Sequence, residues 1–349
     1  MQNRPDSQTN PGGDTVQMEQ TARALRGAGH DVTVSFELDP HLSDFDLVHL
    51  FNLTRPFETF AQAENAKRQA KPYVLSSVYW DLDAAVPWYA YEFPRNWWRR
   101  LIPERFRRAM RRRELAHENP KDLQRRILRE ARLVFPNSDA EALHIVERFD
   151  GLSPDKFCVV RNGVLPPPRS DDTSAEDYKG AFVCAGAIGP RKNQLGLVKA
   201  FRRLPNERLL ILGGTAPRSE RYYEATTRAA GPNVEFRDYM PHHEVSGILR
   251  NAKALVQPSF IETPGLSAME AAAVGTPIVV ADVVPVREYF GDLGHYCDPA
   301  SPPSIAEACR GACLAKKRDG QDFVEAYEWM TVLETMTRAY AELEARKTL

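Results

Sequence analysis

The sequence has few cysteines, and their spacing suggests neither a disulfide framework nor a zinc site. The five are scattered along the chain, and several lie inside apolar runs: Cys158, Cys184, Cys297, Cys309 and Cys313. Isolated cysteines in apolar runs are typical of reduced core residues. We therefore expect a protein that relies on neither disulfides nor structural zinc.

Long hydrophobic runs are also lacking. No stretch of about 18 apolar residues occurs, which is the length that a membrane-spanning helix needs. The first 30 residues do not show the charged-then-apolar pattern of a signal peptide. These absences predict a cytoplasmic protein that does not span a membrane.

The chain has no excess of one charge. Lys and Arg number 46 and Asp and Glu number 47, so no overall field selects nucleic acid, and we expect no nucleic-acid partner. One segment departs from this balance, because residues 95–132 hold 14 Lys or Arg against 5 Asp or Glu and include Trp97 and Trp98. Such a segment predicts peripheral binding to an anionic membrane at the inner face of the cell membrane. The main alternative is a helical insertion whose tryptophans pack on the first domain. Nucleic-acid binding by this segment is a third interpretation, which no recognised nucleic-acid-binding motif accompanies.

The length of 349 residues predicts two α/β domains. The clearest break is three consecutive prolines, Pro166–Pro168, followed by a polar run. We expect an N-terminal acceptor-binding domain at 1–168 and a donor-binding domain at 178–318. The C-terminal helices at 319–349 are expected to pack back on the first domain.

The second domain alternates short apolar runs with helical patterns. A parallel sheet that is covered on both faces produces this alternation. The predicted strands are Ala181–Ala185, Leu209–Leu212, Val234–Phe236, Ala254–Val256 and Pro277–Val280.

The first domain shows the same alternation of strands and helices, but it lacks the pattern of a first strand. A helix from about Thr15 is predicted to precede strands at Val32–Phe36, Leu47–Leu50 and Tyr73–Leu75. A Rossmann-type domain normally opens with a strand that becomes central in its sheet. Only Met1–Pro11 precede Gly12 here, and the run from Gln2 to Asn10 is polar. The first strand is therefore expected to be missing or truncated.

The most informative stretch for chemistry holds two carboxylates, Glu262 and Glu270, eight positions apart. Pro264 and Gly265 lie between them and place Glu262 in a loop and Glu270 on a helix. The free N–H groups of a helix start favour an anion, and carboxylates accept hydrogen bonds from sugar hydroxyls. The pattern indicates a ligand that carries both an anionic group and sugar hydroxyls. The alternative is that the two carboxylates are ordinary surface residues, because acidic residues at a helix start stabilise the helix.

Further motifs occur in a consistent order along the chain. They are Gly29–Val32, Phe45–His49, Pro136–Ser138, Asn162–Val164, Gly186 with Pro190–Asn193, and Asn233–Phe236. Together with the two carboxylates, they resemble the family-4 retaining glycosyltransferases (glycosyl transferases group 1). This resemblance implies the GT-B fold, which is α/β with two Rossmann-like domains whose parallel sheets face a central cleft.

The resemblance also implies roles for residues of the second domain. Glu270 should bind the ribose hydroxyls of a nucleotide, and Glu262, with the amides of Gly265 and Leu266, should hold the transferred sugar. Lys192 should neutralise the diphosphate, beside the turn at Gly186. Many family members have an arginine where Ala187 stands here, so Arg191 is our substitute for the second phosphate contact.

Two features of the first domain have two interpretations each. Gly12 and Gly13, at the mouth of the first helix, form either a loop for the acceptor or donor phosphate or a simple helix start with an N-cap. His49 either belongs to this loop or is a core histidine. No catalytic histidine can be transferred from the family, because Ser76–Asp81 follows the strand where many members have one.

The activity implied by the resemblance is transfer of a hexose from a nucleotide-diphosphate sugar to a hydroxyl. The acceptor would be a saccharide or a lipid-linked molecule of envelope or exopolysaccharide synthesis. No cofactor and no metal are expected, and the motif Asp81-Leu82-Asp83 is weak evidence for a metal site. The alternatives are a same-fold epimerase or phosphorylase, or an inactive member that only binds a nucleotide sugar.

Overall fold

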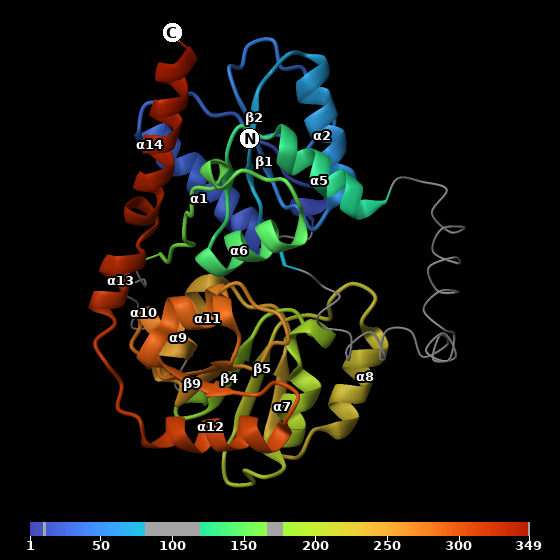
Figure 1. The fold of residues 1–349 in the computed structure, drawn as a ribbon. Helices are drawn as coiled ribbons and strands as arrows, with labels where there is room; N and C mark the ends of the chain where they lie inside the picture. Colours follow the sequence, from blue (N-terminus) through green and yellow to red (C-terminus); the bar gives the residue numbers. More distant parts are fainter. Residues whose placement is uncertain (10–11, 81–118, 166–176, 348–349) are drawn as a thin grey trace. The chain divides into compact units, whose positions relative to one another are not determined.

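The computed structural model describes residues 1–9, 12–80, 119–165 and 177–347, and within them the chain forms two compact α/β units (Figure 1). Unit 1 comprises the described residues up to Gly163, together with those from Tyr327 onward. Unit 2 comprises the described residues from Val164 to Ala326. The motif at Asp81–Asp83 and the tryptophans Trp97 and Trp98 lie outside the described residues, as does most of the basic segment 95–132.

Unit 2 is built on a parallel sheet of six strands in the order β6-β5-β4-β7-β8-β9. This order reverses between β4 and β7, so the chain winds in both directions from a central pair. In such sheets the crevice at the carboxyl ends of the two central strands is the usual ligand site. The strands are β4 (Phe182–Ala185), β5 (Leu209–Leu212), β6 (Val234–Arg237), β7 (Ala254–Gln257), β8 (Ile278–Ala281) and β9 (Gly294–Cys297).

Among the described residues, seven α-helices connect and flank these strands. Apolar strand residues such as Phe182, Ile211 and Val256 are buried together with helix residues such as Phe201 and Ile305. Strands that are apolar throughout require helices on both faces, which is the arrangement that the sequence predicts. The helices are α7 (Gln194–Phe201), α8 (Glu220–Ala229), α9 (His242–Asn251), α10 (Leu266–Ala273), α11 (Val284–Phe290), α12 (Pro302–Leu314) and α13 (Gln321–Tyr327).

Unit 1 has a smaller parallel sheet in the order β1-β2-β3. Its strands are β1 (Val48–Phe51), β2 (Tyr73–Ser76) and β3 (Val134–Phe135). Its helices are α1 (Gly13–Gly27), α2 (Pro56–Arg68), α5 (Pro120–Glu130), α6 (Asp139–Arg148) and α14 (Trp329–Lys347). The predicted α/β class with parallel sheets is thus confirmed for both units.

Residues at the start of the sequence lie between the segment at Ser35 and β1, but they form only isolated bridges there, at Gln2. Gln2 bridges Ser35 on one side and Leu50 on the other, in parallel orientation on both sides. The predicted strand Val32–Phe36 is wrong, because the segment forms only an isolated bridge at Ser35. A strand needs a partner along its length, and among the described residues Met1–Asn3 alone are paired with this segment.

The helix α14 packs against α1, and both belong to unit 1 (Figure 1). Its residues Leu333 and Met336 are buried, and the hydroxyl of Tyr340 is hydrogen-bonded to Nδ1 of His49 at 2.7 Å. A side chain on Gly163 would collide with Trp329, so this glycine allows the first turn of α14 to lie against it.

The cysteines are free, and Cys184, Cys297 and Cys309 are buried. Cys313, near the end of α12, is exposed and Cys158 is half-buried, so the interpretation of the cysteines as core residues is wrong for these two. No described helix combines the length and the apolar character needed to cross a lipid bilayer.

Candidate active site

The turn after β4 begins the candidate site of unit 2. Gly186 has a φ of 137°, a conformation that favours glycine, and its N–H donates to the carbonyl of Leu212 on β5. The chain then forms a short 3-10 turn at Pro190–Lys192. This turn presents Lys192 beside Gly186, because a Cβ built on the glycine would lie 3.5 Å from the lysine Cε.

Asn193 fixes this turn in place. It adopts the left-handed conformation, with a φ of 59°, and its side-chain oxygen caps α7 by accepting from Gly196 N–H. Its side-chain nitrogen donates to the carbonyls of Pro258 and Pro299, at 3.0 and 2.7 Å. One side chain thereby ties the turn after β4 to the loops after β7 and β9.

The loop after β7 supplies the carboxylate. Glu262 lies in this loop and Glu270 lies on α10, as the Pro-Gly pattern predicts. Gly265, with a φ of 95°, is the N-cap residue of α10. A Cβ at this position would lie 2.8 Å from Oε1 of Gln257 and 2.9 Å from Cγ of Glu262, so only glycine fits between these side chains.

Lys192 and Glu262 form the ion pair at the centre of the site. Lys192 Nζ lies 2.6 Å from Glu262 Oε2, and the same oxygen accepts from Ser259 Oγ at 2.9 Å and from Gln257 Nε2 at 3.0 Å. Burial alone would raise the pKa of Glu262. The positive charges of Lys192 and Arg191, together with the hydrogen bonds from Lys192 and Ser259, outweigh burial and lower this pKa.

The pair leaves groups available for a ligand. All three hydrogen bonds to Glu262 reach Oε2, so Oε1 of this carboxylate is left to accept from hydroxyls. The N–H groups of Leu266 and Ser267, the first two residues of α10, have no partner within the helix and favour an anion. The Arg191 side chain is exposed on the same turn as Lys192. The structure thus brings together Gly186, Lys192, Glu262 and Gly265, between the carboxyl ends of β4 and β7.

Charged side chains of the protein itself lie at the start of α1, beside Gly12 and Gly13. Gly12 is the N-cap residue of α1 and Gly13 is its first residue. The carboxylate of Asp14 lies at this helix start, where it accepts from Arg4 Nε and from the Asn52 amide, both at 2.9 Å. An anion already satisfies this helix end, which favours the N-cap interpretation over a phosphate loop.

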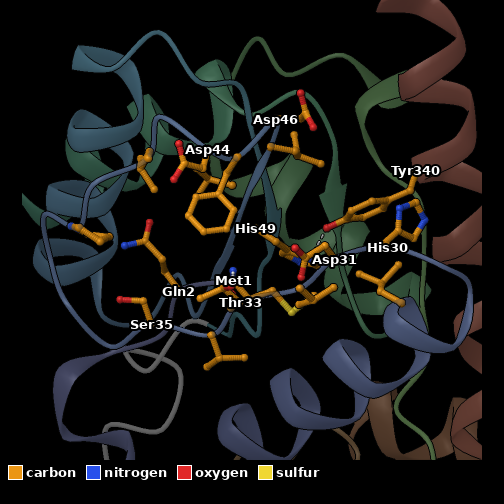
Figure 2. A pocket seen from close by; sticks show the side chains of 18 of the residues that line it. Met1, Gln2, His30, Asp31, Thr33, Ser35, Asp44, Asp46, His49 and Tyr340 are labelled. Carbon is orange, nitrogen blue, oxygen red and sulfur yellow. Dashed lines mark hydrogen bonds between the residues drawn. The ribbon is translucent and has the colours of Figure 1, made fainter.

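His49 is a core histidine here. Its ring is buried, and its nitrogens are hydrogen-bonded to Ser76 Oγ at 2.9 Å and to the Tyr340 hydroxyl (Figure 2). Burial and the nearby N-terminal amine hold its pKa well below the ordinary value, so the ring is neutral. With both nitrogens engaged, His49 has none left for a phosphate.

Sequence reasoning missed Gln257 and the pair of Arg4 and Asp14. Gln257 ends β7, where a polar residue usually signals only that a strand stops. Arg4 lies in a polar segment that looks like a disordered start, yet its side chain is 9% exposed. Among the described residues, no three His, Cys, Asp or Glu side chains are grouped in a way that could hold a metal ion.

Comparison with known proteins gives a family match for the part of the chain that holds this site. Residues 170–321, which include Lys192, Glu262 and Glu270, match the model of the family described as Glycosyl transferases group 1. The match covers the donor-binding domain that the sequence predicts.

The chain is also similar in sequence to proteins that are named as glycosyltransferases. The chain is 28% identical over 135 residues to O-antigen chain mannosyltransferase B of Escherichia coli, covering 37% of this chain and 35% of that protein. It is 30% identical over 239 residues to D-inositol 3-phosphate glycosyltransferase of Corynebacterium efficiens, covering 59% of this chain and 55% of that protein. The matches thus span between about a third and just over half of these relatives.

Solved structures share the fold over nearly the whole chain. Sucrose-phosphate synthase from Thermosynechococcus elongatus superposes with a TM-score of 0.74 at 17% identity, covering 96% of this chain and 94% of that one. HepE from Anabaena, in complex with UDP and glucose, superposes with a TM-score of 0.69 at 14% identity, covering 95% and 96%. At such identities the likeness shows the fold, which is that of the GT-B glycosyltransferases.

Proposed function

We propose that the chain is a glycosyltransferase that moves a hexose from a nucleotide-diphosphate sugar to a hydroxyl of an acceptor. The observation that carries this proposal is the ion pair of Lys192 and Glu262 at the point where the strand order of unit 2 reverses. A cation for a diphosphate and a carboxylate for sugar hydroxyls stand there side by side. The match of residues 170–321 to the group 1 family supports the same activity.

In this proposal each residue has one role. Lys192, assisted by Arg191 and the start of α10, stabilises the negative charge that grows on the leaving diphosphate. Glu262 accepts from hydroxyls of the transferred sugar through Oε1, and Glu270 accepts from the ribose hydroxyls of the nucleotide. Gly186 and Gly265 let the donor approach the backbone closely.

The chemistry is transfer with retention at the anomeric carbon. The bond between this carbon and the phosphate oxygen breaks, and the bond to the acceptor oxygen forms on the same face. The acceptor's proton passes to the departing phosphate, so the reaction needs no separate base and no cofactor. Charge stabilisation by Lys192 and the helix start takes the place of a metal ion in this scheme.

We place the activity in envelope or exopolysaccharide synthesis, on a saccharide or lipid-linked acceptor bound by unit 1. The E. coli relative, named as an O-antigen chain mannosyltransferase, supports this setting. The same setting fits a protein at the cytoplasmic face of the cell membrane.

A donor screen tests the proposal. UDP-, GDP- and ADP-hexoses are incubated with the protein and simple saccharide acceptors, with and without EDTA, and free nucleotide and glycosylated product are measured. Lys192→Ala should lower kcat more than it weakens donor affinity, because the phosphate charge peaks in the transition state. Lys199→Ala, an exposed lysine on α7, is the matched control and should leave both unchanged.

The screen also separates the alternatives. Nucleotide-sugar binding without transfer or release would indicate an inactive binding member. Interconversion of the donor sugar would indicate an epimerase, and sugar phosphate formed from inorganic phosphate and a glycoside would indicate a phosphorylase. If EDTA abolishes turnover, the metal-free scheme is wrong.

A further inference from the structure

Asn193 joins three segments at the carboxyl ends of the strands in unit 2. Its side-chain nitrogen donates to the carbonyls of Pro258 and Pro299, at 3.0 and 2.7 Å, in the loops after β7 and β9. Its side-chain oxygen accepts from Gly196 N–H and caps α7. The residue is 5% exposed, so water does not compete strongly for these bonds. The whole amide group is thus used to hold backbone groups of other segments.

Asparagine meets two requirements of this position at once. The φ of Asn193 is 59°, in the left-handed region that glycine and asparagine tolerate best. Glycine would accept this conformation but has no side chain to offer. Aspartate would keep the helix cap but has no N–H to donate. The residue type therefore fits a position that must both turn the chain and hold two carbonyls.

The bond to Pro258 falls between the residues that hold Glu262. Gln257 and Ser259, the two neighbours of Pro258 along the chain, both donate to Oε2 of Glu262. Asn193 therefore fixes the backbone between the two neutral donors of the carboxylate. It also directly follows the lysine of the ion pair, so it bears on the position of both charged groups.

A second bond joins the same turn to the same loop. The carbonyl of Arg191 accepts from Phe260 N–H at 2.9 Å. Lys192 thus lies between two residues that are bonded to the loop after β7, Arg191 before it and Asn193 after it. A lysine side chain is long and flexible, and the entropy of holding it offsets much of the attraction in a single ion pair. The place of Lys192 Nζ, 2.6 Å from Glu262 Oε2, depends on how its backbone is held.

We propose that Asn193 is a positioning residue for sugar transfer, which sets the distance between Lys192 and Glu262 by tying the Pro190–Lys192 turn to the loops after β7 and β9. This role rests on the proposed function, in which Lys192 and Glu262 bind the donor. The spacing keeps the cation at the diphosphate and the carboxylate at the transferred sugar. A misplacement of about 1 Å between such groups can lower a rate by on the order of 100-fold.

The titration of Glu262 measures this spacing without any substrate. Burial would raise the pKa of Glu262, but the positive charges of Lys192 and Arg191 lower it. If Lys192 withdraws, this pKa should rise. Carbon-13 NMR of protein labelled at the glutamate carboxyl groups follows the titration, and Glu262→Gln assigns the signal. Burial raises the pKa of Cys184, near the pair, to about 12, so this thiol stays neutral during the titration.

Asn193→Gly is the decisive variant. Glycine keeps the left-handed conformation and weakens a helix N-cap only slightly, but it removes both donations to the loops. We expect the Glu262 titration to move to higher pH, and kcat/KM for sugar transfer to fall by about 10-fold or more. The acid limb of the pH–rate profile should move in the same direction. An unchanged Glu262 titration in the folded variant would overturn the proposal.

Asn233→Ala is the matched control in the same unit. The side-chain nitrogen of Asn233 donates to three backbone carbonyls, those of Phe201, Leu204 and Glu207. Asn233 therefore ties backbone segments as Asn193 does, but it precedes β6 and so lies at the amino end of a strand, away from the candidate site. Its loss should lower Tm by about 2 to 4 °C and leave both the Glu262 titration and kcat/KM unchanged. Equal shifts of the titration in the two variants would assign the effect to general loosening and refute the role of Asn193.

Gly196→Ala displaces the Asn193 side chain without replacing it. A Cβ at this glycine would lie 2.5 Å from Oδ1 and 2.8 Å from Nδ2 of Asn193, so the amide must move. Alanine favours a helix over glycine, so α7 itself is not weakened. We expect the Glu262 titration to move to higher pH and kcat/KM to fall, as in Asn193→Gly. If Asn193→Gly does not fold, this variant decides, and an unchanged titration in it contradicts the proposal.

The positioning role and the proposed function fail in different ways. Sugar transfer by the wild type, with the Glu262 titration and kcat/KM both unchanged in Asn193→Gly, would refute the positioning role alone. A shifted titration in a protein that transfers sugar from no donor would refute the proposed function, while the spacing of Lys192 and Glu262 would still be assigned to Asn193.

Discussion

At the scale of single residues, Glu262 is held by three donors on one oxygen, and only one of them is charged. Gln257→Leu removes a neutral donor and keeps the ion pair with Lys192. Loss of such a bond costs about 0.5 to 1.5 kcal/mol, so we expect kcat/KM to fall by about 2- to 10-fold. Hydrogen bonds from Lys192 and Ser259 lower the pKa of Glu262. We expect the Gln257 donor to act in the same direction, so its loss should move the acid limb of the pH–rate profile to higher pH.

Measurement of the sugar-transfer rate as a function of pH gives both kcat/KM and the position of the acid limb. The control is Gln321→Leu, an exposed glutamine at the start of α13, which should change neither. An unchanged profile in Gln257→Leu would mean that Lys192 and Ser259 alone position the carboxylate.

The buried carboxylate of Glu141 should make the free energy of unfolding depend on pH. This carboxylate is buried at the start of α6 and accepts from Ser77 Oγ and from the backbone N–H groups of Tyr79 and Asn137. Burial outweighs these bonds and raises its pKa from 4.5 to about 7. Between these values the folded chain holds a proton that the unfolded chain has lost, so the free energy of unfolding should fall as pH rises, by about 3 kcal/mol in all.

Denaturant unfolding at pH 4.5, 5.5, 6.5 and 7.5 measures this slope. Glu141→Gln mimics the protonated acid and should remove most of it. Asp139→Asn, at an exposed position on the same helix, should leave it intact. A slope that persists in Glu141→Gln would assign it to another group.

The candidate site could be predicted where the required residue type is unusual. Gly186 and Gly265 both have a positive φ, a conformation that favours glycine. Such glycines, together with two carboxylates around a Pro-Gly turn, form a pattern uncommon enough in sequences to indicate a ligand site. Gln257 could not be found this way, because its role depends on a contact across the loop that follows β7. For His49, the decisive partner is Tyr340, which lies 291 residues away.

At the scale of elements, the buried strands of unit 2 follow directly from the sequence. The run Leu209–Leu212 coincides with β5, since a strand that is covered on both faces must be apolar throughout. β9 was missed because three of its four residues are only partly buried and it lies at the edge of the sheet. β3 was missed because two residues are too short to form a pattern.

The helix α14 carries a prediction about unit 1. Removing the chain from Trp329 onward would uncover the face of α1 and take away the buried Leu333 and Met336. Two such side chains correspond to roughly 3 to 6 kcal/mol. We therefore expect the calorimetric transition of unit 1 to be lost or strongly lowered, while nucleotide binding by unit 2 persists.

A milder variant calibrates this result. Tyr340→Phe removes only the hydroxyl that is bonded to His49 and should cost about 1 to 3 kcal/mol, because a buried ring nitrogen is left unpaired. Calorimetry with and without added nucleotide resolves the two units. Full stability of unit 1 in the truncated chain would contradict the role assigned to α14.

At the scale of the whole molecule, the basic segment 95–132 leads to a prediction about membranes. Its described part includes α5, in which Leu123, Ile127 and Leu128 are buried, so this helix packs on unit 1. If residues 95–118 meet an anionic surface, each Lys or Arg there contributes about 1 kcal/mol, and binding should weaken with salt. The protein should float with anionic vesicles at low salt and not with neutral ones.

Trp97 and Trp98 decide between membrane binding and packing. Replacing both by alanine should reduce flotation if they anchor in the headgroup region, and should lower Tm alone if they pack on the protein. Absence of flotation with anionic vesicles at low salt would leave only packing.

The bond between Tyr340 and His49 also bears on the order in which a newly made chain acquires its structure. The described residues of unit 2 all lie between Val164 and Ala326, so a ribosome releases all of its described elements before α14 exists. Unit 1 is begun first but lacks the face of α14 while those residues are made, which takes roughly 10 to 30 s at common elongation rates. During synthesis, α1 and His49 therefore remain uncovered by α14 until the described residues of unit 2 have been made, and unit 1 is the later of the two units to be completed.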